Sequence, residues 1–247
     1  MARVAGISPA SVQRIWAAND IKPHLTRTFK LSKDPNFEEK FWDVFGLYLN
    51  PPDKALVLCC DEKSQVQALE RTQPGLPLGI GHIRTQSHDY VRHGTVTLFT
   101  ALDYLQGRLI STIESQHRHQ EWLEFLKKIN RETPKSLQLH LIVDNYATHK
   151  TPEVMAWLEK HPRFKLHFTP TSASWMNLVE RFFAEITTRR IRRGSYSSVD
   201  DLKAAIYDYL LQHNTRPKPF VWTKSAEDIL TRERRALDAL DEIRGNR

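Results

Sequence analysis

Three acidic residues, Asp61, Asp144 and Glu180, stand where the sequence predicts rigid backbone. Asp61 and Asp144 each close an apolar run of strand type, 55–60 and 139–143, and Glu180 lies in the first turns of a predicted helix. Carboxylates that approach each other near a core repel strongly, and a divalent cation removes that repulsion. Magnesium prefers such oxygen ligands together with substrate phosphates, and two ions about 4 Å apart support in-line phosphoryl displacement. The three acids are therefore candidate metal ligands of a phosphoryl-transfer site.

A structural role remains open for each acid at this point. A lone aspartate at a strand end more often forms a turn or caps a helix than binds a metal. The spacing of 83 positions from Asp61 to Asp144, and of 36 from Asp144 to Glu180, does not decide between the two roles. The residues around the acids are needed for that.

The charge of the chain favours an acidic partner. Lys and Arg number 36 against 29 Asp and Glu, which gives a net charge of +7. Between residues 181 and 196, five arginines stand against the single acid Glu185: Arg181, Arg189, Arg190, Arg192 and Arg193. Phosphate binding is one interpretation of this run, and a solvated helix end whose cations suit the helix dipole is the other.

The sequence contains no run of about 18 apolar residues and no basic-then-apolar signal pattern at the N-terminus. Its two cysteines, Cys59 and Cys60, are adjacent, so on a strand they point to opposite faces and form no long-range disulfide. We therefore expect a soluble cytoplasmic protein without a membrane partner.

Alternating strand and helix patterns follow residue 54, and they predict an α/β fold with a mixed sheet covered on both faces. The predicted strands are 55–61, 65–69, 95–102, 108–113, 139–144 and 164–168. The predicted helices are 117–131, a helix from 151, the Glu180 helix capped by Ser172 or Ser174, 198–214 and 225–240. Residues 25–54 form a connector that contains an amphipathic stretch.

Residues 5–23 predict a turn followed by a short helix, with Ser8 as N-cap and Pro9 at the first helical position. An apolar stripe of Val12, Ile15 and Trp16 leaves Ser11 and Arg14 facing outward. This pattern is typical of the second half of a helix-turn-helix, whose last helix reads DNA. An ordinary amphipathic helix is the alternative.

The blocks around the acids resemble a known family. Asp61-Glu62-Lys63-Ser64, the run from Asp144 to Lys150, and the run from Ser174 to Phe183 are similar to the three signature blocks of bacterial insertion-sequence transposases. This group is related to the mariner transposons and lies in the DDE superfamily. The resemblance covers nearly the whole chain and implies a ribonuclease H-like, mixed five-stranded sheet with helices on both faces. It also implies three regions: a partial helix-turn-helix segment at 1–24, the connector at 25–54 and a catalytic domain at 55–247.

The resemblance implies that Asp61, Asp144 and Glu180 are the metal-binding triad, with two Mg²⁺ or Mn²⁺ ions. Family enzymes hydrolyse phosphodiester bonds at transposon ends, and the freed 3′-hydroxyl then attacks target DNA without a covalent protein–DNA intermediate. The implied partners are transposon-end and target DNA, with a homodimer assembled on the DNA. The implied location is the bacterial cytoplasm, associated with the nucleoid when DNA is bound.

Further residues match the second and third blocks: Asn145, His149, Lys150, Trp175 and Asn177. We expect His149 to orient a carboxylate or contact phosphate, and Lys150 to contact phosphate. Asn177 and Glu180 are three positions apart, so we expect them to share a helix face. Local capping or surface polarity is the alternative for each.

Residues 6–24 resemble the last helix-turn-helix segment of the family, so we expect further DNA-reading helices ahead of Met1 in a full-length member. This predicts weak recognition of specific DNA ends by the chain. Two alternatives to a transposase catalytic domain stay open. One is a catalytically idle remnant that binds DNA or intact transposase, and the other is a ribonuclease H-like nuclease without strand transfer.

Overall fold

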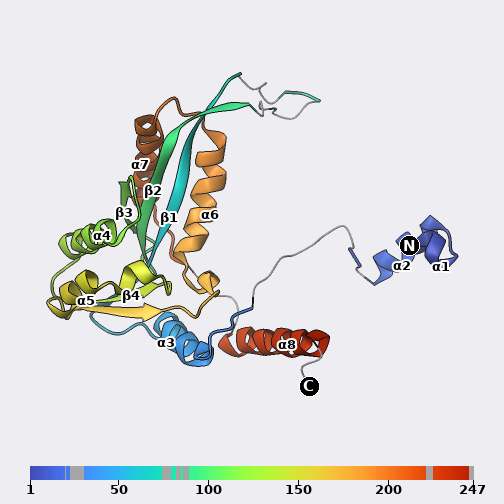
Figure 1. Cartoon of the computed structure of the whole chain (residues 1–247), viewed down its shortest axis with the longest axis horizontal. Helices are drawn as coiled ribbons and strands as arrows, with labels where there is room; N and C mark the ends of the chain where they lie inside the picture. The colour runs from blue at the N-terminus through green and yellow to red at the C-terminus, as the bar shows by residue number, and fades with distance from the viewer. Residues whose placement is uncertain are drawn as a thin grey trace. The chain divides into compact units, whose positions relative to one another are not determined.

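The computed structural model describes residues 1–19, 21–22, 31–73, 79–81, 85, 89–220 and 225–244 (Figure 1). The chain divides into two compact units, Met1–Leu31 and Ser32–Arg247. The predicted boundary between residues 24 and 25 lies outside the described residues. The amphipathic stretch predicted within the connector is a helix, α3 (Phe37–Leu49), and it belongs to the second unit.

The first unit contains two short helices, α1 (Ala2–Ala5) and α2 (Pro9–Ala18). Ser8 caps α2 with its side chain, as predicted. Within this unit Val12 is buried, whereas Ile15 is 49% exposed, so the apolar stripe of α2 is only partly covered. DNA reading by this helix stays a prediction.

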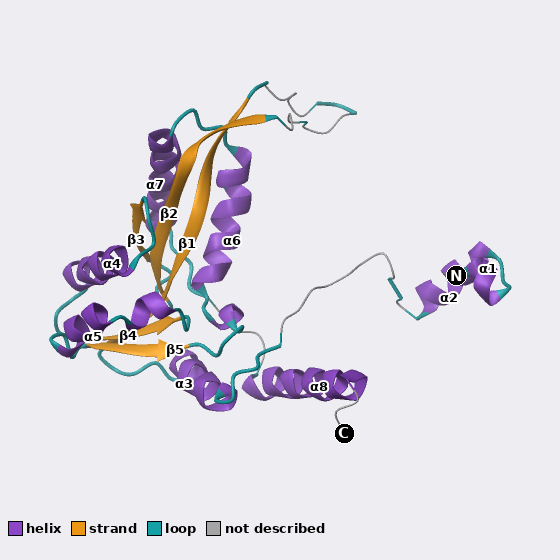
Figure 2. Cartoon of the chain, viewed as in Figure 1, coloured by secondary structure: helices purple, strands orange, loops and turns teal. Residues whose placement is uncertain are grey.

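The second unit is built on a five-stranded sheet in the order β3-β2-β1-β4-β5 (Figure 2). The pairs β3–β2 and β2–β1 are antiparallel, whereas β1–β4 and β4–β5 are parallel. The predicted α/β class with a mixed five-stranded sheet is thereby confirmed. The strands are β1 (Ala55–Arg71), β2 (Tyr90–Asp103), β3 (Leu109–Glu114), β4 (Gln138–Val143) and β5 (Phe164–Phe168).

Strand β1 is longer than predicted. We expected two strands, 55–61 and 65–69, because the polar run that begins at Asp61 resembles a break. The structure shows one strand that stays paired with β2 and shifts register just after Lys63. Gln65 has a positive φ of 55° there, and such a bulge adds a residue to one strand without ending the ladder. Asp61 therefore lies inside β1 and does not close it.

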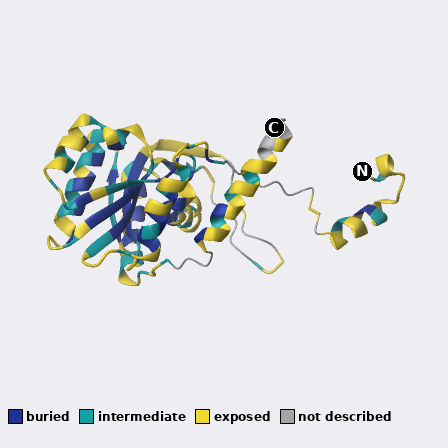
Figure 3. Ribbon diagram, turned by 90° about the horizontal axis from the view of Figure 1, so that it is seen from below, coloured by how far each residue is buried: buried dark blue, intermediate teal, exposed yellow. Residues whose placement is uncertain are grey.

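Helices cover both faces of the sheet, as predicted, and the strands between them are buried (Figure 3). Cys59 is buried in the core on the side of α3, α6 and α7, and Cys60 in the core on the side of α4 and α5. This alternation confirms that the two thiols point to opposite faces. The helices of the second unit after α3 are α4 (His119–Glu132), α5 (Pro152–Glu159), α6 (Val179–Arg189), α7 (Val199–Thr215) and α8 (Ala226–Arg244).

The helix that contains Glu180 begins later than predicted. We expected Ser172 or Ser174 to cap it, but residues 174–176 form a 3₁₀ turn and α6 begins at Val179 without a side-chain cap. The residue that follows the 3₁₀ turn has extended backbone and is hydrogen-bonded to β1, which delays the start of the helix. Within the described ranges, no helix is long and apolar enough to cross a membrane.

Candidate active site

Asp61 lies in β1, and Asp144 is the first residue after the neighbouring parallel strand β4. The ladder between β1 and β4 ends with Cys59 opposite Ile142. Asp61 and Asp144 have the same offset of 83 positions as this ladder, so they lie opposite each other two residues beyond its last pair. Because side chains alternate along a strand, Asp61 faces the side of the sheet on which Cys59 is buried, the side of α6.

Glu180 approaches that side of the sheet from the first turn of α6. The segment before α6 is attached to β1, because Asn177 Nδ2 donates a hydrogen bond to the Cys60 carbonyl at 2.8 Å. A second attachment comes from α3, where the Tyr48 hydroxyl donates to the Met176 carbonyl at 2.8 Å. Asn177 is buried and precedes the helix, so our expectation that it shares a helix face with Glu180 was wrong.

The three acids share one electrostatic environment. Burial, followed by the negative charge of Glu62, raises the pKa of Asp61 to about 8. The charges of Asp144 and Glu180 raise it further, so both carboxylates lie near Asp61. The Glu62 backbone N–H opposes the shift by donating to Asp61 Oδ1 at 2.8 Å. Burial also raises the pKa of Glu180, against the opposing charge of Lys63.

Asp144 is held by His149. Its Oδ1 lies 3.1 Å from His149 Nδ1 and accepts a 3.1 Å hydrogen bond from the Tyr146 N–H. On the other side of the ring, His149 Nε2 lies 3.6 Å from Glu62 Oε2. The ring centroid of His149 is 4.3 Å from that of Trp122, and 1% of the His149 side chain is exposed. Of the two roles expected for His149, the geometry therefore fits the orientation of a carboxylate. The buried ring has no exposed surface with which to contact a phosphate.

The imidazole is a buried cation. Burial opposes its protonation, but the contact with Asp144 and the negative charge of the nearby Glu62 outweigh burial and raise the pKa of His149 to about 9. For Asp144, burial acts to raise the pKa, yet the contacts with His149 bring it below its usual value. The negative charge of Asp144 is thus offset by the protein, whereas that of Asp61 is not.

The donor chemistry fits a divalent cation. In the described part of the chain, no three His, Cys, Asp or Glu side chains are arranged to hold a metal ion as they stand, and Asp144 is turned toward His149. Three carboxylates on rigid elements nevertheless form an oxygen donor set of the kind Mg²⁺ prefers. The raised pKa of Asp61 is the electrostatic cost that a bound cation removes. The assignment of the triad as metal ligands stays a prediction.

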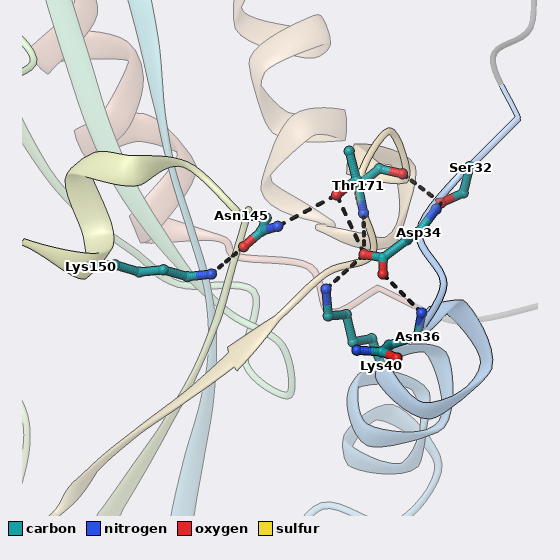
Figure 4. Close-up of polar contacts among 7 residues, drawn as sticks. All are labelled: Ser32, Asp34, Asn36, Lys40, Asn145, Lys150 and Thr171. Atoms are coloured by element: carbon teal, nitrogen blue, oxygen red, sulfur yellow. Dashed lines mark hydrogen bonds and ion pairs between the residues drawn. The ribbon is translucent and has the colours of Figure 1, made fainter.

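Asn145 and Lys150 lie on the surface of the loop after β4 (Figure 4). Lys150 Nζ donates to Asn145 Oδ1 and lies 4.2 Å from the centroid of the Phe168 ring. Asn145 Nδ2 donates to Thr171 Oγ1 at 3.4 Å. The exposed ammonium, six positions after Asp144 in the chain, has a charge suited to a substrate phosphate.

A groove extends from Glu180 along α6. It has a volume of about 330 Å³ and contains two cations, Lys63 and Arg192. We had not included Lys63 or Glu62 among the site residues. In a continuous strand, Lys63 shares a face with Asp61, and Glu62 takes the opposite one. The alternation of side chains along β1 could have identified both residues, but we had expected the strand to end at Asp61 and so did not apply this alternation to them.

The other arginines of the basic run separate in space. Arg181 and Arg189 line a second cavity of about 630 Å³, to which α6 and residues 216–220 contribute. Arg190 instead packs on α7, where its Nε donates to the Ala205 carbonyl at 3.3 Å. Arg193 is exposed. The five arginines of residues 181–193 therefore do not form one continuous basic surface.

The remaining predicted residues are Trp175 in the second unit and Ser11 and Arg14 in the first. Trp175 is exposed in the 3₁₀ turn before α6. In the first unit, Arg14 Nη2 donates to Ser11 Oγ at 3.3 Å on the outer side of α2. A DNA-binding role for these three residues stays a prediction.

Comparison with known proteins gives one family and one relative from an insertion element. The family model described as "DDE superfamily endonuclease" matches residues 57–203, more than half of the chain. A Shigella sonnei protein described as "Insertion element IS630 uncharacterized 39 kDa protein" is 28% identical over 89 residues. That match covers 36% of this chain and 26% of the Shigella protein.

Solved structures of the Mos1 transposase resemble this chain. The "Mos1 mariner paired end complex with Mn" has a TM-score of 0.61 at 14% identity, covering 85% of this chain and 65% of that one. The "catalytic domain of Mos1 mariner transposase" has a TM-score of 0.51 at 11% identity, covering 75% and 85%. At these identities the likeness concerns the fold, and it confirms the predicted ribonuclease H-like class. The chain spans less than two thirds of the relatives named first in each comparison.

Proposed function

The chain belongs to the DDE superfamily endonuclease family, and from this membership we propose that it is the catalytic part of an insertion-sequence transposase. Its substrates are the DNA ends of the element and a target DNA. Its cofactor is Mg²⁺ or Mn²⁺, as a pair of ions held by Asp61, Asp144 and Glu180. The similarity to an insertion-element protein and to the fold of Mos1 transposase supports this proposal.

One observation carries the proposal: the sheet register brings Asp61 opposite Asp144, and the hydrogen bonds at the start of α6 bring Glu180 to the same place. Burial, with the charges of neighbouring acids added to it, raises the pKa values of Asp61 and Glu180, and Lys63 offsets only part of the shift at Glu180. Such a cluster of acids costs stability unless a cation binds there, so its persistence in a folded core supports a role in cation binding.

When bound, the cations activate the attacking oxygen and stabilise the leaving oxygen. His149 holds Asp144 in one orientation, and the Glu62 carboxylate lies 3.6 Å from the other nitrogen of the imidazole. Lys63 and Arg192 bind phosphates of the DNA strand that lies in the groove beside Glu180, and Lys150 binds one from the loop after β4.

Two displacements at phosphorus follow from these roles. In the first, a water oxygen attacks the phosphorus at the transposon end, the bond to the 3′-oxygen breaks, and that oxygen leaves as a 3′-hydroxyl. In the second, this hydroxyl attacks a phosphorus of the target strand and expels its 3′-oxygen. We propose that two copies of the chain assemble on DNA for this purpose, which the paired-end complex of Mos1 supports by analogy of fold.

The test is cleavage of a labelled DNA duplex that carries the sequence flanking the gene, with Mn²⁺ or Mg²⁺ present. We expect Asp144→Asn to lower cleavage by at least about 1000-fold, because the lost ligand removes several kcal/mol of charge stabilisation. The control is Asp53→Asn, an exposed aspartate just before β1, which should cleave at the wild-type rate.

A second measurement does not depend on activity. Mn²⁺ should raise the melting temperature of the wild type and of Asp53→Asn but not of Asp61→Asn, because ligand binding stabilises the folded state by mass action. Equal cleavage by wild type and Asp144→Asn would overturn the catalytic assignment. DNA binding without cleavage in both proteins would instead support an idle remnant.

A further inference from the structure

A chain of hydrogen bonds runs from the start of the second unit to the loop after β4 (Figure 4). We infer that Asp34 is a positioning residue, which sets the orientation of Asn145 and thereby of Lys150 by way of the Thr171 hydroxyl. We call this chain of contacts from Asp34 through Thr171 and Asn145 to Lys150 the relay. Its consequence for DNA cleavage rests on the proposed function, whereas the relay itself does not.

Asp34 is held as a charged carboxylate. Its side chain is 4% exposed, and its Oδ2 lies 2.7 Å from Lys40 Nζ. The Asn36 N–H donates to its Oδ1 at 3.0 Å, and the Thr171 N–H donates to its Oδ2 at 3.0 Å. A carboxylate with several donors keeps its charge and its orientation.

The same segment holds the backbone of Thr171 from both sides. Ser32 Oγ donates to the Thr171 carbonyl at 2.6 Å and accepts the Asp34 N–H at 3.2 Å. Both backbone groups of Thr171 are therefore bonded to residues more than 130 positions earlier in the chain. Because the partners are remote in sequence, these bonds form only in the folded unit.

The turn that contains Thr171 needs such support. Ser172 has a φ of 64°, a left-handed conformation that costs a non-glycine residue about 1 kcal/mol. The turn is closed by the Ala173 N–H, which donates to the Pro170 carbonyl at 3.0 Å. The contacts from Ser32 and Asp34 stabilise this strained turn and so fix where the hydroxyl of Thr171 lies.

Hydroxyl chemistry then gives the relay a direction. Thr171 Oγ1 has a single proton to donate, and the charged Asp34 Oδ2 accepts it at 3.4 Å. Towards Asn145 the Thr171 hydroxyl can therefore only accept a hydrogen bond. Asn145 must turn its NH₂ group toward it, and Nδ2 lies 3.4 Å from Thr171 Oγ1. The carbonyl oxygen of Asn145 therefore points to Lys150 and accepts a hydrogen bond from its ammonium group.

The charge on Asp34 therefore selects one of the two amide orientations of Asn145. In Asp34→Asn the replacement amide can donate to Thr171 Oγ1, which frees the hydroxyl proton for Asn145. The Asn145 carbonyl is then drawn to Thr171, and the NH₂ group faces the Lys150 ammonium, which it cannot bind. Lys150 loses its acceptor beside the predicted metal ligand Asp144.

The first experiment is NMR of the side-chain amide of Asn145 in the full chain. We expect a clear shift of its signals in Asp34→Asn and in Thr171→Val, and none in the exposed control Asp53→Asn. Thr171→Val removes only the hydroxyl and keeps the backbone bonds, so it tests the relay even if Asp34→Asn does not fold. An unchanged Asn145 amide in folded Thr171→Val would overturn the relay.

The second experiment is a double-mutant cycle on DNA cleavage. Asp34→Asn should lower kcat by about 10-fold when it is introduced into the wild type, a typical loss for a residue that orients a residue of the site. Introduced into Lys150→Met, it should cause no further loss of kcat. Equal losses in both backgrounds would overturn the functional part. If the wild type cleaves no DNA, the proposed function fails, and the NMR result still decides the relay.

Discussion

The central sheet carries two buried aspartates, Asp61 and Asp103, and the two are stabilised differently. Asp103 ends β2 and lies opposite Leu58, whereas Asp61 lies further along β1. Asp103 Oδ1 accepts the backbone N–H groups of Leu105 and Gln106 at 3.0 Å each, so it closes the turn into β3.

Asp61 accepts one backbone N–H, and the charges of Glu62, Asp144 and Glu180 act on it. Both aspartates follow apolar strand residues, so residue type and local pattern are the same. What separates a turn former from a candidate metal ligand is the kind of group that lies opposite: N–H donors for Asp103, and acids for Asp61. The predictions below test this distinction.

The largest effect is expected for Asp61→Asn. DNA cleavage should fall by at least about 1000-fold, because a metal ligand is lost. Its melting temperature in EDTA at pH 7 should be no lower than that of the wild type, since the pKa of Asp61 of about 8 leaves its carboxyl mostly neutral without metal, and asparagine replaces it with a neutral amide of similar size. A large loss of stability in EDTA would place Asp61 in the same structural class as Asp103.

His149→Gln should destabilise the fold by about 4 kcal/mol, because it leaves Glu62 and Asp144 near each other without the buried cation between them. Urea unfolding at pH 7 measures this. His93→Gln is the matched control: His93 pairs with Glu70 at 2.7 Å on the surface and should change stability by less than about 1 kcal/mol. Equal losses of stability in the two variants would show that the buried His149 between Glu62 and Asp144 stabilises the fold no more than a surface ion pair does.

Asp103→Ala should cost about 3 kcal/mol, since two backbone N–H groups lose a charged acceptor. DNA cleavage at a temperature where the variant is folded should stay within a few-fold of wild type. A loss of cleavage comparable to that of Asp61→Asn would remove the contrast between the two aspartates.

Asp34 gives a smaller and pH-dependent effect. The hydrogen bond from Lys40, with that from the Thr171 N–H, lowers its pKa from 3.8 to about 2. A lowered pKa stabilises the fold at pH values above the unfolded value, here by about 2 kcal/mol, and this is lost as the pH falls from about 4 to about 2. The stability difference between wild type and Asp34→Asn should shrink across that window. A constant difference would contradict the assignment.

Much of the fold followed from local patterns. Apolar runs and turn residues predicted β3, β4 and β5 to within one residue, and the 3.6-residue period predicted α4 and α7 to within two residues. The break assumed in β1 was wrong because a bulge lets a strand continue through a polar run. The late start of α6 was missed because it depends on a bond between Asn177 and Cys60, which are 117 positions apart.

The site was only partly visible in the sequence. The acids and their neighbouring blocks identified the family without any geometry. Glu62 and Lys63 were missed although they follow Asp61 directly, because their faces depend on β1 being one strand. Asp34 and Thr171 carried no local signal, since their roles arise from contacts between remote segments.

By itself the sequence determined the succession of strands and helices from β2 to α5, the opposite facing of Cys59 and Cys60, and the presence of three acids in characteristic blocks. Only the tertiary structure decided that the 83 positions between Asp61 and Asp144 are the register of a parallel ladder. The physical reason is that register depends on the crossover between the strands and on packing against helices from elsewhere in the chain. The same packing decides which buried carboxylate meets donors and which meets other acids.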